Sequence, residues 1–280
     1  MTSELEDSAP PQPATRRGTP SSVRTTLAGA FIVALGICAV LPIRPEVPVR
    51  TAIVGLVAVA LIVGACVLRS AAAIRAAVFI GPLFGLFAVG ILGGWPPAVT
   101  TVLVCALPLA CLLFAGRRPA LRPVVPWLAR GSLTPGAPWL GVATVVLSAA
   151  ALTAWALVVR PEPPEYMSEL QRLPLWLAIL GIVAFALVNP VWEEMLFRGV
   201  LLTELASVWG VRAAVVLQAV LFGAAHFAGF PSGPVGMMMA AAWGFVMGVM
   251  RVRSGGILIT YLVHVTANAV IGTLAVLILR

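Results

Sequence analysis

The chain alternates between long apolar runs and short polar segments over most of its length. The runs do not alternate residue by residue between apolar and polar positions, so they do not predict the strands of a membrane barrel. Most are near the roughly 20 residues with which an α-helix crosses a bilayer. We predict an all-α, polytopic membrane protein with about nine transmembrane helices, of which 235–250 is the shortest. The predicted spans are 27–43, 51–68, 76–94, 98–115, 138–159, 174–204, 212–230, 235–250 and 256–279.

The two halves of the chain differ in the polar groups that these runs contain. Up to about residue 159 the runs hold no charged side chain and no histidine. The later runs carry Glu193, Glu194, Arg198, Gln218, His226, His264 and Asn268. We expect a disordered cytoplasmic tail at 1–25, because its Pro-, Ser- and Thr-rich composition buries little apolar surface. A five-helix N-terminal transmembrane region (26–160) and the working transmembrane region (174–280) follow.

Composition and charge agree with a membrane protein. Of the 280 residues, 61% are hydrophobic and 10% are charged, whereas soluble domains carry about 25% charge. All 18 basic residues are arginine, and they are scattered between apolar runs, which favours topology signals over a nucleic-acid surface. With the N-terminus in the cytoplasm, thirteen arginines lie inside and five outside, so we predict this orientation in the cell membrane. The five outside are Arg44, Arg50, Arg160, Arg172 and Arg280.

The four cysteines all fall in apolar runs of the first half. None has the paired spacing of a zinc site, and a disulfide framework is not expected within lipid. We expect them to act as small apolar packing residues. They are Cys38, Cys66, Cys105 and Cys111.

Two adjacent acids and an arginine lie within the apolar run at 174–204. Charge inside a membrane costs a few kcal/mol per group even on lenient insertion scales, so it is rarely kept without a use. Glu194 and Arg198 are four residues apart and should pair on one helix face, whereas Glu193 is expected to have no partner in its own helix. This interpretation requires one continuous helix through Pro190.

Helix geometry predicts that four polar groups share one layer of the membrane. At about 1.5 Å per residue, Glu193 lies roughly 16 Å from its cytoplasmic helix end and His226 roughly 21 Å. His264 and Asn268 lie roughly 12 and 18 Å from theirs. Groups from three helices at similar depth can form one site.

The residue types suggest hydrolysis by an activated water. No serine or cysteine adjoins a histidine, so a covalent nucleophile is not expected. Glu193, shielded from bulk water, could deprotonate a water together with His226, and His264 with Asn268 could donate hydrogen bonds to the resulting oxyanion. Alternatively, Glu193, His226 and His264 could bind zinc and leave a position open for water. No other cofactor is expected.

At these residues the chain resembles the CPBP family, which comprises the CAAX proteases and the bacteriocin-processing, or Abi, proteins. The resemblance covers about residues 174–275 and rests on three motifs in the family's order. They are Glu193-Glu194-x-x-x-Arg198, Phe222-x-x-x-His226 and His264-x-x-x-Asn268.

The resemblance implies an intramembrane endopeptidase acting on a membrane-associated peptide or lipidated protein. It implies that Glu193 and His226 activate water and that His264 and Asn268 stabilise the oxyanion. Glu194, Arg198 and Phe222 would support them. The family has been described both as metalloproteases and as glutamic peptidases, so the metal stays open. Its eukaryotic members cleave prenylated C-a-a-X proteins, and many bacterial members are tied to bacteriocin immunity.

Two other classes of function remain open. A proton-coupled transporter could use Glu193 and the histidines as a relay, although no paired halves are visible. A non-catalytic membrane scaffold or immunity protein could keep the motifs for structure.

Other polar and large residues receive structural interpretations. We expect Glu204 to be a solvated charge at a helix end and Gln218 to pack within its bundle. Trp243 and the neighbouring methionines 237–239 should face lipid or pack. The Gly- and Pro-rich segment 229–234 should form a tight outer turn.

Overall fold

The computed structural model describes residues 23–123, 125–132, 135–160 and 172–277, and these residues form helices and no strands. The predicted all-α class is confirmed. The predicted tail falls almost entirely on residues 1–22, outside the described part, and the first helix begins at Val23. The α-helices are α1 (Val23–Val40), α2 (Pro48–Val67), α3 (Ala71–Leu92), α4 (Pro97–Ala115), α5 (Ala137–Val159), α7 (Leu175–Glu194), α8 (Leu202–Trp209), α9 (Val211–Ala225), α10 (Gly233–Ser254) and α11 (Leu258–Leu277).

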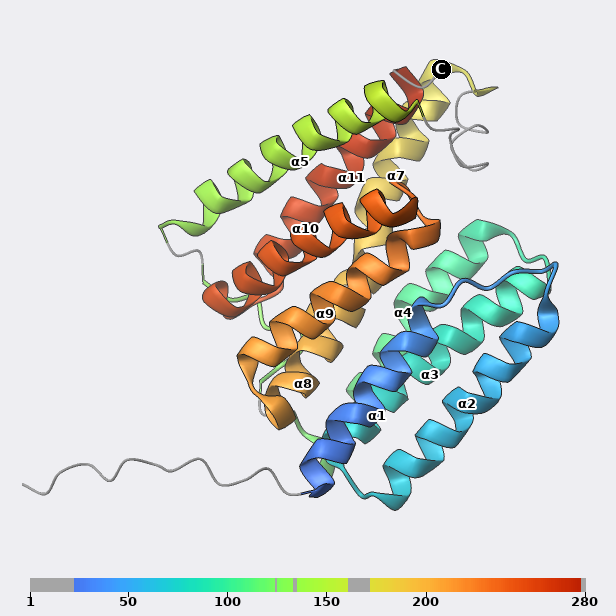
Figure 1. The fold of residues 1–280 in the computed structure, drawn as a ribbon, viewed down its shortest axis with the longest axis vertical. Helices are drawn as coiled ribbons and strands as arrows, with labels where there is room; N and C mark the ends of the chain where they lie inside the picture. Colours follow the sequence, from blue (N-terminus) through green and yellow to red (C-terminus); the bar gives the residue numbers. More distant parts are fainter. Residues whose placement is uncertain (1–22, 124, 133–134, 161–171, 278–280) are drawn as a thin grey trace, which may run out of the picture.

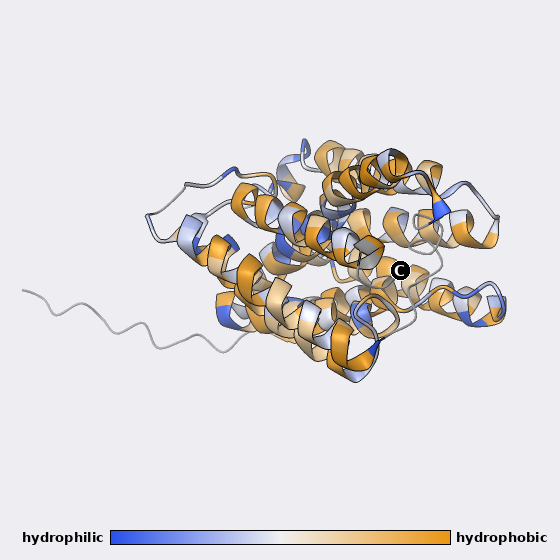
Figure 2. Cartoon of the chain, turned by 90° about the horizontal axis from the view of Figure 1, so that it is seen from above, coloured by the Kyte–Doolittle hydropathy of each residue, from blue (hydrophilic) through white to orange (hydrophobic). Residues whose placement is uncertain are grey.

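Most of these helices are suited to a bilayer. In the described residues, eight helical segments are long and apolar enough to cross a membrane, and Leu258–Leu274 is a shorter apolar helix. Large apolar side chains such as Leu56 of α2 and Leu147 of α5 are exposed, as expected where lipid replaces water around the protein. Hydrophobic residues predominate along the helices in Figure 2. The chain is therefore an integral membrane protein.

The helices form two groups joined along α8 and α9 (Figure 1). Helices α1 to α4 pack on one another, and α1 and α3 also pack against α8. The largest buried apolar cluster lies at this junction and includes Ile32, Phe79 and Leu201. The other group contains α7, α10 and α11, with α5 alongside them. The junction is thus the core against which the polar second half is held.

Helix α5 stands with the second half, although the sequence grouped it with the first four spans. It packs against α11 and α10, and its Trp155 meets Phe230 with ring centroids 5.2 Å apart. The composition of α5 is almost uniformly apolar, so its sequence does not indicate which helices it packs against. The predicted region 26–160 is therefore divided in space between two helix groups.

The segment Leu175–Trp209 runs as one helical span, as the sequence interpretation required. Pro190 lies inside α7 without ending it. The carbonyls of Leu187 and Val188, near the proline, accept hydrogen bonds from Tyr261 of α11 and Cys105 of α4. These contacts join α7 to α11 and to α4 beside the proline.

A π-helix, η2 (Met195–Leu201), follows α7 directly. The Leu202 N–H donates to the Phe197 carbonyl, five residues back, which is the spacing that defines a π-turn. Single π-turns inside α-helices often occur at functional sites because they change the direction of neighbouring side chains. Here the π-helix begins immediately after the two acids.

The C-terminal helices differ from prediction in their ends. Helix α10 covers Gly233–Ser254 and is longer than the predicted 235–250; Arg251 and Arg253 occupy its last turn, where positive charge is favourable. Helix α9 ends at Ala225, and His226 opens a short 3₁₀ turn, η3 (His226–Ala228). His226 therefore lies at a helix end, before the turn that the sequence predicted at 229–234.

Glu204 is not a solvated helix-end charge, and that prediction is wrong. It is fully buried, and its carboxylate accepts hydrogen bonds from Arg75 Nε at 2.8 Å and Trp127 Nε1 at 2.9 Å. Arg75 belongs to α3 and Trp127 to the α4–α5 connection. A position near the end of an apolar run looks exposed in sequence, but two partners from the first half of the chain cover it.

Candidate active site

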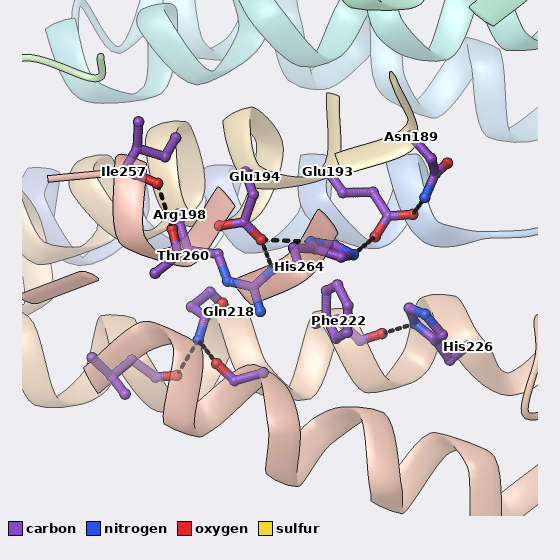
Figure 3. A network of polar contacts seen from close by, with 12 residues as sticks. Asn189, Glu193, Glu194, Arg198, Gln218, Phe222, His226, Ile257, Thr260 and His264 are labelled. Carbon is purple, nitrogen blue, oxygen red and sulfur yellow. Dashed lines mark hydrogen bonds and ion pairs between the residues drawn. The ribbon is translucent and has the colours of Figure 1, made fainter. Parts of the chain in front are cut away.

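Glu194 is the centre of a buried ionic cluster (Figure 3). Its Oε1 accepts a hydrogen bond from Arg198 Nη1 at 2.9 Å and lies 2.8 Å from His264 Nδ1. The side chains are almost completely buried. The pairing of Glu194 with Arg198 agrees with the sequence prediction, and the contact with α11 adds a partner that helix spacing could not show.

Glu193 has a polar partner in its own helix, so the prediction that it has none is wrong. Asn189, one turn earlier, donates from Nδ2 to Glu193 Oε1 at 2.8 Å. The Asn189 amide is itself fixed, because Trp192 Nε1 donates to its Oδ1 at 3.1 Å. Glu193 Oε2 has no hydrogen-bond partner among the described residues, and it lies 3.4 Å from His264 Nε2.

His264 therefore lies between the two adjacent acids. An ionised carboxylate only accepts hydrogen bonds, so the contact with Glu194 requires a proton on Nδ1 of His264. In the neutral ring, Nε2 then carries a lone pair toward Glu193. A shared proton or an intervening polar group is required for this second contact to be favourable.

His226 is oriented by α9, the helix that ends just before it. Its Nδ1 lies 2.9 Å from the Phe222 carbonyl oxygen, which can only accept, so Nδ1 carries the proton and Nε2 is left with a lone pair. Its ring also packs on that of Phe222, with centroids 4.5 Å apart. No hydrogen bond joins His226 to Glu193 in the part of the chain that the structure describes.

A cavity of about 420 Å³ brings the polar groups together beside an apolar space. Its walls come from α5, α9, α10, α11 and the turn after η3. His226, His264 and Asn268 line it, and Asn268 Nδ2 is buried without a hydrogen-bond partner among the described residues. Two hydroxyl residues on α5, Thr144 and Ser148, also line it, but their hydroxyls donate to carbonyls of α5 itself. The donor left free in the cavity wall therefore comes from Asn268 of α11 and not from the hydroxyls of α5.

Part of the cavity wall consists of residues that are also exposed on the outside of the helix bundle. Ala143, Leu147 and Ala151 of α5 and Ala242 of α10 line the cavity and are exposed to the surroundings of the helices. In a membrane those surroundings are lipid. The cavity is consequently bordered by the bilayer along α5 and α10.

Phe222, the remaining motif residue, packs against both charged and aromatic groups. The guanidinium carbon of Arg198 lies 4.5 Å from the centre of its ring, a distance suited to a cation–π contact. Its backbone and ring both contact His226. Phe222 thus connects the ionic cluster to the cavity.

The three residues predicted as a possible zinc site do not form one in this arrangement. Among the described residues, no three His, Cys, Asp or Glu side chains form a group that could hold a metal ion. Both nitrogens of His264 face carboxylates, and Nδ1 of His226 faces a carbonyl. As they lie here, Glu193, His226 and His264 do not fit a common metal, so no step below is assigned to one. The four cysteines are free; Cys38 is buried, as expected of a packing residue, whereas Cys66 is exposed.

Sequence patterns could have revealed part of what was missed. Asn189 precedes Glu193 by four residues, the spacing at which helix neighbours meet. Gln218, predicted to pack, is fully buried, and its Nε2 donates to the Gly244 carbonyl of α10 at 2.9 Å. The contact between Glu194 and His264, by contrast, joins residues 70 positions apart and has no local signal.

Comparisons with known proteins agree with the motifs. Residues 174–270 match the model of the family described as "Rce1-like: Type II CAAX prenyl endopeptidase Rce1-like", which confirms the predicted resemblance over these residues. An uncharacterized 24.3 kDa protein of Escherichia coli is 32% identical over 142 residues, covering 48% of this chain and 61% of that protein. The chain thus spans about three-fifths of that relative's length. No solved structure matches the chain.

Proposed function

We propose that this chain is an intramembrane endopeptidase that hydrolyses a peptide bond of a membrane-associated substrate. The observation that carries the proposal is the unpartnered Oε2 of Glu193, 3.4 Å from His264 Nε2, next to a cavity lined by His226 and Asn268. The family match over residues 174–270 supports a protease in general terms.

Glu193 is the base in the proposed reaction. It keeps one free oxygen, while Asn189 orients the carboxylate through the other. A water held between Glu193 and a neighbouring imidazole would transfer a proton to Glu193 while the oxygen of that water attacks the peptide carbonyl. His226 supports this step, since the lone pair of its Nε2 can accept a hydrogen bond from the water or a proton bound for the leaving amine.

His264 and Asn268 are the proposed oxyanion donors. Asn268 lines the cavity and has an amide N–H with no partner in the described part of the chain. Glu194 fixes the plane of the His264 ring through Nδ1, so its Nε2, when protonated, can donate to the developing oxyanion. Donors fixed in advance stabilise this charge without reorganisation during the reaction.

Lipid and a membrane-bound peptide or lipidated protein are the proposed partners, and the cytoplasmic position of the N-terminus is part of the proposal. The cavity is largely apolar and open to lipid along α5 and α10. A substrate already dissolved in the bilayer could therefore reach the polar groups without crossing water.

The test is a cleavage assay with protein purified in detergent. Wild type and the variants Glu193→Gln, His226→Ala and His264→Ala are incubated with prenylated and unprenylated membrane peptides, and the purified protein is analysed for bound metal. We expect cleavage by wild type and a loss of about a hundredfold or more in Glu193→Gln. Proton-coupled uptake in proteoliposomes, abolished by the same change, would instead support a transporter. A cellular phenotype that survives Glu193→Gln would support a scaffold.

A further inference from the structure

Trp243 of α10 contacts side chains from all three motifs, although it belongs to none of them. Its ring lies 4.8 Å from that of His264 at a steep angle of 71° and 5.4 Å from that of Phe222. The guanidinium carbon of Arg198 lies 5.2 Å from its centre. One indole therefore touches the acid–arginine helix, α9 and α11 at a single point.

The contact with Arg198 matters because this cation has few hydrogen bonds. Its Nη1 is bound to Glu194, whereas Nε and Nη2 are buried and have no hydrogen-bond partner among the described residues. A buried charge needs other favourable contacts. The faces of Phe222 and Trp243 supply them, since aromatic rings attract a guanidinium and tryptophan does so most strongly.

Trp243 is held in place by the close approach of α9 and α10. Gly244 follows it directly, and the space beside the Gly244 Cα is filled by Phe222. The Gly244 carbonyl accepts the hydrogen bond from Gln218, and Gly248, one turn later, lies against the same Gln218 side chain. Two glycines four residues apart let membrane helices come close enough for such contacts.

Trp243 also lines the cavity. Its indole thus lies between Arg198 and the apolar space proposed to receive the substrate, while His264 lines that space beside it. Removing the indole would expose the guanidinium to that space and take away the ring contact that lies 4.8 Å from His264.

We infer that Trp243 is a positioning residue of the reaction, which holds Arg198 by a cation–π contact and fixes the plane of the His264 ring. This inference rests on the proposed peptidase function. Trp243 would then be a fourth contributor to the reaction beside the three motifs. Its substitution should lower the turnover rate and leave substrate binding largely unchanged.

The experiment compares Trp243→Leu, which removes the aromatic ring, with Trp243→Phe, which keeps one. We expect Trp243→Leu to lower kcat about tenfold or more with KM within about threefold of wild type, and Trp243→Phe to keep most of kcat. The matched control is Trp155→Leu, because Trp155 is a buried tryptophan that packs on Phe230 and lies outside the ionic cluster. Equal kcat in the Leu and Phe variants, an effect on KM alone, or an equal loss in the control would overturn the inference.

A thermal double-mutant cycle tests the contact without any activity. Arg198→Met is made in the wild-type and Trp243→Leu backgrounds, and the loss of Tm in the second is expected to be smaller by roughly 2–4 °C. If the Tm loss of the double variant equals the sum of the losses of the two single variants, the cation–π contact is overturned. If Trp243→Leu does not accumulate in membranes, Trp243→Met replaces it in both experiments.

The two readouts separate this inference from the proposed function. Wild-type protein that cleaves no peptide overturns the peptidase and the role of Trp243 in turnover, while the thermal cycle still decides the Arg198 contact. Active wild type with indistinguishable Leu and Phe variants overturns the inference alone.

Discussion

Oε2 of Glu193 lies 3.4 Å from Nε2 of His264, while the other ring nitrogen of His264 lies 2.8 Å from Oε1 of Glu194. Adjacent residues on a helix point about 100° apart, so a single group from another helix must lie between two such acids to contact both. The acids are then unequal: Glu194 is paired with Arg198 and with Nδ1 of His264, whereas Glu193 has no arginine partner. Among the described residues, each acid keeps one buried oxygen without a hydrogen-bond partner.

This inequality predicts that two matched substitutions differ in their effect on stability. Glu193→Gln should abolish cleavage but leave Tm nearly unchanged, because Glu193 has no arginine partner. Glu194→Gln should cost about 3–5 kcal/mol of stability, since it leaves the buried Arg198 without its counter-charge. Thermal unfolding in detergent, followed alongside cleavage, checks both; similar Tm losses in the two variants would contradict the assignment.

Asn189 should affect the reaction through Glu193. Asn189→Ala removes the hydrogen bond to Glu193 Oε1, and a freely rotating carboxylate is a poorer base, so we expect kcat to fall about tenfold. Trp192→Phe is the milder comparison, because it removes only the donor that orients the Asn189 amide. Steady-state kinetics give the order of effects, and a larger loss in Trp192→Phe would be inconsistent with this arrangement.

The width of the cavity should be set by small residues of α5. Ala151→Leu would fill part of the cavity from an exposed position, so KM should rise severalfold for substrates with bulky apolar groups while Tm changes little. Ala150→Leu is the control, since Ala150 is also exposed on α5 but does not line the cavity. Equal KM values for the two variants would mean that substrate does not enter beside α5.

The buried pair of Arg75 and Glu204 should stabilise the junction between the two helix groups. Arg75→Met alone leaves a buried carboxylate without its cation and should cost about 3–5 kcal/mol. The double change Arg75→Met with Glu204→Leu should cost less than either single change, because it removes both charges together. Denaturation in detergent measures the three variants, and a double variant less stable than both single ones would disprove the pairing.

Metal removal provides a final prediction. With both nitrogens of His264 facing carboxylates, the proposed water activation assigns no step to a metal. Cleavage should therefore persist after prolonged treatment with a chelator. Activity that is lost on chelation and restored by zinc would require the two histidines and Glu193 to rearrange around the ion.

Local spacing in the sequence determined the features that a single helix controls. Length and hydropathy gave the spans, and the i, i+4 spacing of Glu194 and Arg198 gave their pair, because residues one turn apart meet in any α-helix. The three motifs similarly identified the polar residues that line or adjoin the cavity.

The tertiary structure decided the contacts between helices: His264 between the two acids, α5 beside α10 and α11, Glu204 buried against Arg75, and Trp243 on Arg198. In a soluble protein, an amphipathic stripe would show which helix face is buried. In lipid, the outward and inward faces are both apolar, so packing and a few polar contacts select the neighbours. Those choices are invisible in the order of residues and exist only once the helices are assembled.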